Sequence, residues 1–105
     1  MPVKKQVLKS RPVCKTTFRL PEEAAEDAGT VHLAGDFNDW SETATPMKRL
    51  KGGDFTVTLE LETGREYAYR YLLDSKRWRN DPESEALRPS PAYPGVENSV
   101  VFCGI

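Results

Sequence analysis

The chain has 105 residues, close to the usual size of one domain, which leaves no room for a second independent core. Hydrophobic residues make up 38% and charged residues 30%, a profile typical of a globular protein rather than of a disordered or membrane chain. The formal net charge is only −1, so a surface that neutralises nucleic-acid phosphates is not expected.

Residues 1–12 are basic and polar, and we expect them to form an N-terminal arm without fixed structure, followed by one β-sandwich domain over residues 13–105. The arm and the acidic cluster at 22–27 are interpreted as solvated surface. No apolar run approaches the ~20 residues needed to cross a bilayer. Because the N-terminus also lacks the apolar stretch of a signal peptide, a cytoplasmic location is expected.

Alternation of apolar and polar side chains predicts antiparallel strands along the rest of the chain. The clearest is 55–61, in which every second side chain is apolar. In 66–74 three tyrosines and Leu73 share one face of the strand, and Arg70 lies on the opposite face. Further strands are expected at 13–20, 30–34, 45–50, 77–79 and 99–103.

Glycine and proline mark the connections between these strands. Residues 21–29 begin with proline and end with glycine, which predicts one helical turn or a bulky loop. Residues 83–95 contain three prolines, which cannot donate to a strand ladder, so a long loop is expected there. About seven short strands joined in this way predict an all-β fold, an antiparallel β-sandwich.

The two cysteines, Cys14 and Cys103, lie far apart and have no histidine or cysteine at metal-ligand spacing. A zinc site is therefore excluded, and no cofactor is indicated. Free thiols are the favoured interpretation of both cysteines, and a disulfide is the less favoured one. The one histidine, His32, lies inside a strand pattern with its side chain outward, so no cysteine–histidine nucleophile is expected.

Trp40 and Trp78 are the most informative residues, because both lie in turn-rich segments rather than inside alternating strands. An indole at a loop tip offers a flat apolar face on which a sugar ring can stack. Arg70 and Asn98 could then hydrogen-bond the sugar hydroxyls. The alternative is that each tryptophan caps one end of the core, as we expect for Phe37.

Five stretches form an ordered set: LAGDFNDWS at 33–41, PM at 46–47, GREYAYRY at 64–71, WRNDP at 78–82 and NSVV at 98–101. Together they resemble the glycogen-binding modules of carbohydrate-binding module family 48. Such modules occur in the β subunit of AMP-activated protein kinase and at the N-terminus of isoamylases and glycogen-branching enzymes. The resemblance covers roughly residues 13–102 and implies an immunoglobulin-like, early-set β-sandwich that binds α-1,4-linked glucan.

The resemblance also implies a sugar site. Trp40 and Trp78 match the two stacking tryptophans of the kinase modules, and Arg70 stands where those modules have a sugar-contacting lysine. Tyr93 lies near their sugar-inserting leucine, and Asn98 lies one place after the position of their contacting asparagine. The turn at 74–77 is one residue longer than in the kinase modules, which could re-aim Trp78.

Several functions stay open at this point. The first is a non-catalytic glucan-binding module, and the second is an interaction domain that docks on a glycoside hydrolase family 13 enzyme, on a kinase or on a second copy of itself, with the sugar site lost. An enzyme using Asp74, Asp81 and Glu83 is disfavoured, because glycoside hydrolysis needs two carboxyl groups across a cleft. Nucleic-acid binding is disfavoured by the charge, no membrane contact is expected, and a monomer or weak homodimer is expected.

Overall fold

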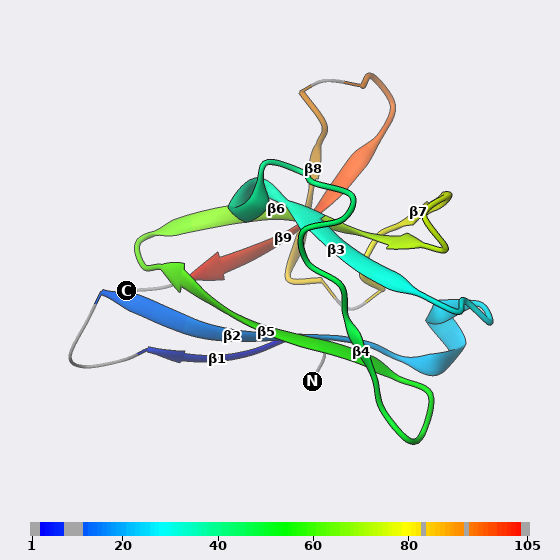
Figure 1. The fold of residues 1–105 in the computed structure, drawn as a ribbon. Coiled ribbons are helices and arrows are strands. Elements are labelled where there is room, and N and C mark those ends of the chain that lie inside the picture. The colour runs from blue at the N-terminus through cyan, green and yellow to red at the C-terminus, as the bar shows by residue number, and fades with distance from the viewer. Residues whose placement is uncertain (1–2, 8–11, 83, 92, 104–105) are drawn as a thin grey trace.

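The computed structural model describes residues 3–7, 12–82, 84–91 and 93–103. Two antiparallel sheets pack face to face, so the predicted fold class is confirmed (Figure 1). The four-stranded sheet has the order β1 (Val3–Val7), β2 (Val13–Leu20), β5 (Phe55–Glu62) and β4 (Lys48–Arg49). The five-stranded sheet has the order β3 (Val31–Gly35), β6 (Arg65–Leu73), β9 (Glu97–Cys103) and β8 (Ala86–Pro89), and β7 (Arg77–Arg79) pairs with β6.

The core lies between the sheets and follows the alternation of the strands. The tyrosines of β6 point inward with their rings buried, whereas Arg70 lies on the outer face, as predicted. The ring of Phe18 on β2 meets the ring of Tyr69 edge-on, with centroids 5.0 Å apart. Phe37 packs against the same Phe18 ring at 5.6 Å, which confirms that it caps the core. Because the inner face is filled in this way, any binding surface of the five-stranded sheet must lie on its outer face.

Helical structure in the described residues is limited to two short 3-10 turns. η1 (Glu22–Ala25) is the single turn that the proline and glycine of residues 21–29 predict, and η2 (Asp36–Asn38) follows β3 directly. No helix in this part of the chain has the length and apolar character needed to span a membrane. Both cysteines are free thiols buried in the core, as predicted.

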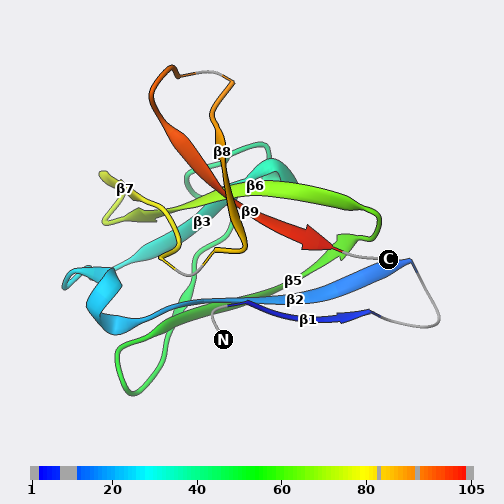
Figure 2. The same ribbon diagram turned by 180° about the vertical axis from the view of Figure 1, so that it is seen from behind.

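Residues 3–7 correct the expectation of an arm without fixed structure. They form β1, which pairs with β2 in a register that runs from Val3 opposite Phe18 to Val7 opposite Cys14 (Figure 2). Backbone N–H and C=O groups along an open strand edge readily accept a partner strand, and β1 supplies that partner for β2. Residues 1–2 and 8–11 of the expected arm lie outside the described residues.

The expected loop at 83–95 is also shorter than the sequence indicates. Residues 86–89 form β8, which pairs with β9 and places Pro89 opposite Glu97. β8 is the outermost strand of its sheet, and a proline on an edge strand can turn its nitrogen to solvent without removing a ladder hydrogen bond. The prolines therefore exclude a central strand at this point, but not an edge strand.

Candidate functional site

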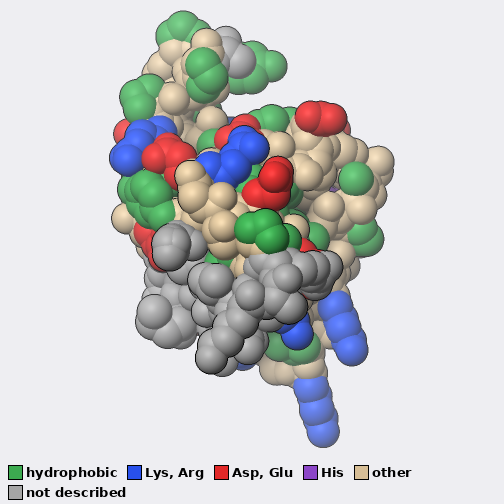
Figure 3. Space-filling view, turned by 90° about the vertical axis from the view of Figure 1, so that its left-hand side faces the viewer, with side chains coloured by type: hydrophobic (Ala, Val, Ile, Leu, Met, Phe, Trp, Pro, Cys, Tyr) green, Lys and Arg blue, Asp and Glu red, His purple; other side chains and the backbone are tan. Residues whose placement is uncertain are grey.

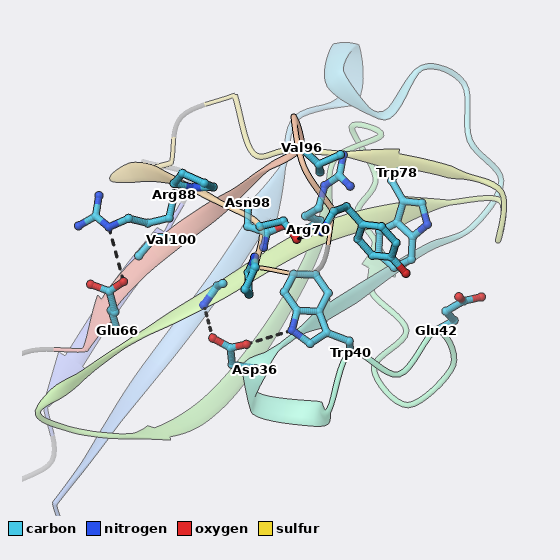
Figure 4. Close-up of a pocket in the computed structure, with 15 residues that line it drawn as sticks. Asp36, Trp40, Glu42, Glu66, Arg70, Trp78, Arg88, Val96, Asn98 and Val100 are labelled. Carbon is cyan, nitrogen blue, oxygen red and sulfur yellow. Dashed lines mark hydrogen bonds and ion pairs between the residues drawn. The ribbon is translucent and has the colours of Figure 1, made fainter.

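A pocket of about 680 Å³ opens on the outer face of the five-stranded sheet (Figure 4). Its floor is formed by outward residues of β6 and β9, and its walls come from the η2 loop, β7 and the β8–β9 hairpin. The side chains predicted from the sequence as a site all line this pocket: Trp40, Arg70, Trp78, Tyr93 and Asn98. Tertiary structure thus brings together five residues that span almost sixty positions of the chain.

Trp40 is held in place by an unusual backbone and by its own loop. Asp39 and Trp40 both have positive φ angles, 56° and 58°, a region that a bulky residue rarely adopts. The backbone N–H of Trp40 donates to the Gly35 carbonyl at 2.9 Å, and its indole N–H donates to Asp36 Oδ1 at 3.0 Å. Asp36 Oδ2 in turn accepts from the Ala68 N–H at 2.8 Å. The indole is therefore fixed to β6 by a carboxylate bridge.

Trp78 lies opposite Leu72 in the β6–β7 hairpin and faces the same pocket. The ring centroids of Trp40 and Trp78 are 6.5 Å apart, and their planes are inclined by 55°. Both indoles are half-buried, so each keeps part of its surface open to solvent. The longer turn at 74–77 thus leaves Trp78 on the same side of the sheet as Trp40, where the two rings form a tilted pair.

Arg70 lies on the pocket floor, with its guanidinium carbon 5.8 Å from the centre of the Trp78 ring. Its Nε is buried and has no hydrogen-bond partner within the described residues. Burial lowers the pKa of Arg70 below its ordinary value, and the nearby charge of Arg79 adds to this effect. The side chain is therefore packed against an aromatic ring instead of a carboxylate, which leaves a charged donor facing the pocket.

The β8–β9 hairpin forms the far wall. Figures 1 and 3 show that its loop stands above the rest of the molecule and carries hydrophobic side chains at its tip. Tyr93 lies in this loop and is 68% exposed, whereas Asn98 lies on the floor and is 7% exposed. The loop is closed by the Ser90 N–H, which donates to the Val96 carbonyl at 2.7 Å. An exposed phenol ring thus stands over a pocket whose floor carries a buried amide.

The segment after Trp78 is anchored through the core. Asp81, 3% exposed, accepts hydrogen bonds from the hydroxyls of Tyr69 at 2.7 Å and Tyr71 at 3.3 Å. Its own N–H donates to Ser99 Oγ at 2.8 Å, and Ser99 Oγ donates to Asn80 Oδ1 at 2.9 Å. The Asp81 carboxylate is thus buried and bonded to two tyrosines of β6, and the Asp81 backbone is bonded to β9. Glu83, the third carboxylate weighed for catalysis, lies outside the described residues.

Glu26 contacts the face of β7 that is turned away from the pocket. Its carboxylate accepts two hydrogen bonds from Arg79, at 2.6 and 3.0 Å, and lies 3.5 Å from Arg77. These arginines flank Trp78 in sequence and point away from the pocket. Glu26 therefore binds β7 on the face opposite Trp78. The hydrogen bond from Arg79 holds the pKa of Glu26 below its ordinary value of 4.5.

Replacing Glu26 with glutamine is expected to loosen β7, because the amide cannot accept both hydrogen bonds from Arg79. NMR should show the Trp78 indole signal broadened and shifted, while Glu23→Gln, an exposed neighbour on η1, leaves it unchanged. The wild type should keep its signal above pH 4.5 and approach the variant only as the pH falls through the lowered pKa of Glu26. An unchanged indole signal in Glu26→Gln would contradict this role.

The pocket also contains residues that the sequence did not single out. Asp36 positions Trp40, and its spacing of four residues from Trp40 within one loop is the signal that could have revealed it. Glu66 and Arg88 lie at the end of the pocket away from Trp78, on strands whose pairing was not predicted. Among the described residues, no three histidine, cysteine or acidic side chains are placed to hold a metal ion.

The chain is also similar in sequence to known proteins. The chain is 34% identical over 74 residues to the 1,4-alpha-glucan branching enzyme GlgB of Butyrivibrio fibrisolvens, an alignment that covers 65% of this chain but only 12% of that enzyme. The family model of carbohydrate-binding module 48, the isoamylase N-terminal domain, matches residues 13–87. The matched stretch contains Trp40, Arg70 and Trp78, whereas Tyr93 and Asn98 lie beyond it. A match over more than half of the chain, on a β-sandwich of this form, shows that the protein belongs to carbohydrate-binding module family 48.

Proposed function

We propose that this chain is a non-catalytic module that binds α-1,4-linked glucan by stacking sugar rings on Trp40 and Trp78. The observation that carries the proposal is the tilted pair of indoles, 6.5 Å apart and inclined by 55°, at one pocket. Successive rings of an α-1,4-glucan are inclined to one another, whereas a β-1,4-glucan is a flat ribbon. A tilted pair of platforms therefore favours the α-linked chain.

The polar groups of the pocket also suit a neutral sugar. Its lining contains three carboxylates, Asp36, Glu42 and Glu66, and two guanidinium groups, Arg70 and Arg88. Such a balance does not favour a polyanion, which argues against single-stranded nucleic acid. Sugar hydroxyls both donate and accept, so Arg70 and the Asn98 amide are suitable partners for them. Asp36 is committed to Trp40 and Ala68, which supports a binding role rather than a catalytic one.

Because the aligned branching enzyme is many times longer than this chain, we further propose that the module acts beside a glucan-processing enzyme. A shallow site alone binds weakly, and attachment to a catalytic partner or to a polymer raises the effective concentration. A kinase partner is the other candidate from the family resemblance. The competing proposal, a docking domain without a sugar site, predicts that the pocket does not respond to glucan.

Titration with maltoheptaose, followed by tryptophan fluorescence, tests these proposals. We expect a saturable change with a Kd on the order of 0.1–1 mM and tighter apparent binding to glycogen. Cellopentaose, in which the linkage is β-1,4, should produce little change, and maltopentaose, which has the same number of sugar units, is the matched comparison for it. No response at millimolar maltoheptaose would refute the glucan proposal and favour the docking domain.

A further inference from the structure

The pocket continues along the sheet beyond Trp40, Trp78 and Arg70. Glu66 and Val100 line its other end, on the floor formed by β6 and β9, and Arg88 of β8 forms the wall beside them (Figure 4). Phe102 is the next outward residue of β9 after Val100, and it lies directly opposite Glu66 in the strand register. It is 38% exposed. The outer face therefore has a second aromatic surface, separated from the tryptophans along the strands.

Arg88 and Glu66 form an ion pair at this second end. Arg88 Nε lies 3.7 Å from Glu66 Oε2, and the Arg88 guanidinium carbon lies 5.8 Å from the centre of the Phe102 ring. Both charged side chains are about half exposed, at 49% and 46%, so they remain accessible to a ligand. An exposed ion pair contributes little to folding stability, so stability alone does not account for its position at the pocket wall.

The chemistry of this pair suits a sugar. A guanidinium group donates hydrogen bonds and a carboxylate accepts them, whereas each hydroxyl of a sugar can do both. A vicinal diol can therefore donate to Glu66 and accept from Arg88 at the same time. Phe102, whose ring lies beside the Arg88 guanidinium, supplies an exposed apolar surface against which the C–H groups of a pyranose ring can pack. Because Glu66 would repel an anion, a neutral hexose fits this end better than a phosphate group does.

We infer that Arg88, Glu66 and Phe102 form a second sugar subsite, which takes a glucose unit of the same chain that stacks on the tryptophans. This inference rests on the proposed function. Arg70 and Glu66 are four residues apart on β6, a separation of roughly 13 Å at about 3.3 Å per residue, which exceeds the width of one hexose ring. The favoured ligand is therefore a linear α-glucan long enough to reach both ends, rather than a short oligosaccharide.

The test compares maltotriose with maltoheptaose by calorimetric titration of the full chain. Wild-type protein should bind maltoheptaose more tightly, and Arg88→Ala should lose about tenfold in affinity for maltoheptaose while its affinity for maltotriose stays within about twofold. Glu66→Ala should show the same length-dependent loss. Arg49→Ala is the matched control, because the exposed Arg49 also lies over an aromatic ring, that of Phe55, but on the other sheet.

Amide NMR gives a readout that needs no variant. The signals of Val100 and Phe102 should shift on addition of maltoheptaose and stay in place with maltotriose. Equal affinity of the wild type for both sugars, or an equal loss for both in Arg88→Ala, would overturn the second subsite and leave the tryptophan site intact. If the wild type bound neither maltotriose nor maltoheptaose, the proposed function would be refuted, and the second subsite with it.

Discussion

Replacing Trp78 with alanine is expected to weaken maltoheptaose binding by about thirtyfold, which corresponds to ~2 kcal/mol. The loss has two causes. The variant lacks one of the two stacking platforms, and it also lacks the ring that supports the Arg70 guanidinium at 5.8 Å. Trp78→Phe should retain part of the affinity, since a smaller aromatic face remains. Fluorescence titration measures both variants, with Trp40 as the remaining reporter.

A fair comparison requires that the variant still folds. Trp78 lies on the outer face, so its loss leaves the tyrosine core in place, and near-ultraviolet circular dichroism of the tyrosines can verify this. Leu87→Ala is the matched control. This exposed apolar residue is on β8 opposite Ser99, on the face of the sheet that does not form the pocket. Unchanged affinity in a folded Trp78→Ala protein would exclude stacking on this ring.

The largest effect on stability is expected at Asp81. Asp81→Ala would leave the buried hydroxyls of Tyr69 and Tyr71 without their acceptor, and each unsatisfied buried donor costs ~1–3 kcal/mol. Burial raises the pKa of both tyrosines far above its ordinary value, so both hydroxyls keep the protons that they donate. We expect a loss of about 3 kcal/mol or more in the free energy of unfolding, and a Tm lower by on the order of 15 °C.

Urea denaturation and calorimetry would measure this loss. Tyr71→Phe removes only the longer of the two hydrogen bonds, 3.3 Å, and should cost about 1 kcal/mol. Asp81→Asn keeps an acceptor oxygen without its charge, so it should fall between the two. A loss in Asp81→Ala no larger than that in Tyr71→Phe would show that the carboxylate does not hold the two tyrosines together.

Some residues of the site could be predicted from the sequence, and others could not. The alternation of 66–74 placed Arg70 outward and the tyrosines inward, and the structure confirms both. Asp36 was missed, because its partner atoms belong to Trp40 and to the backbone of Ala68, a residue of a different strand. Arg88 was missed because the three prolines of residues 83–95 predicted a loop instead of β8. That β8 is an edge strand, on which proline is tolerated, depends on its pairing with β9.

By itself, the sequence determined that the fold is built of antiparallel strands, which side chains of β2, β5 and β6 face inward, and the family to which the motifs point. These features depend on local periodicity and on residue type, which the chain carries at each position. Only the tertiary structure decided that Trp40 and Trp78 share one side, that β1 and β8 extend the sheets, and that Glu66 meets Arg88 beside the same pocket. Those outcomes depend on strand order and register between residues far apart in sequence, which local periodicity does not specify.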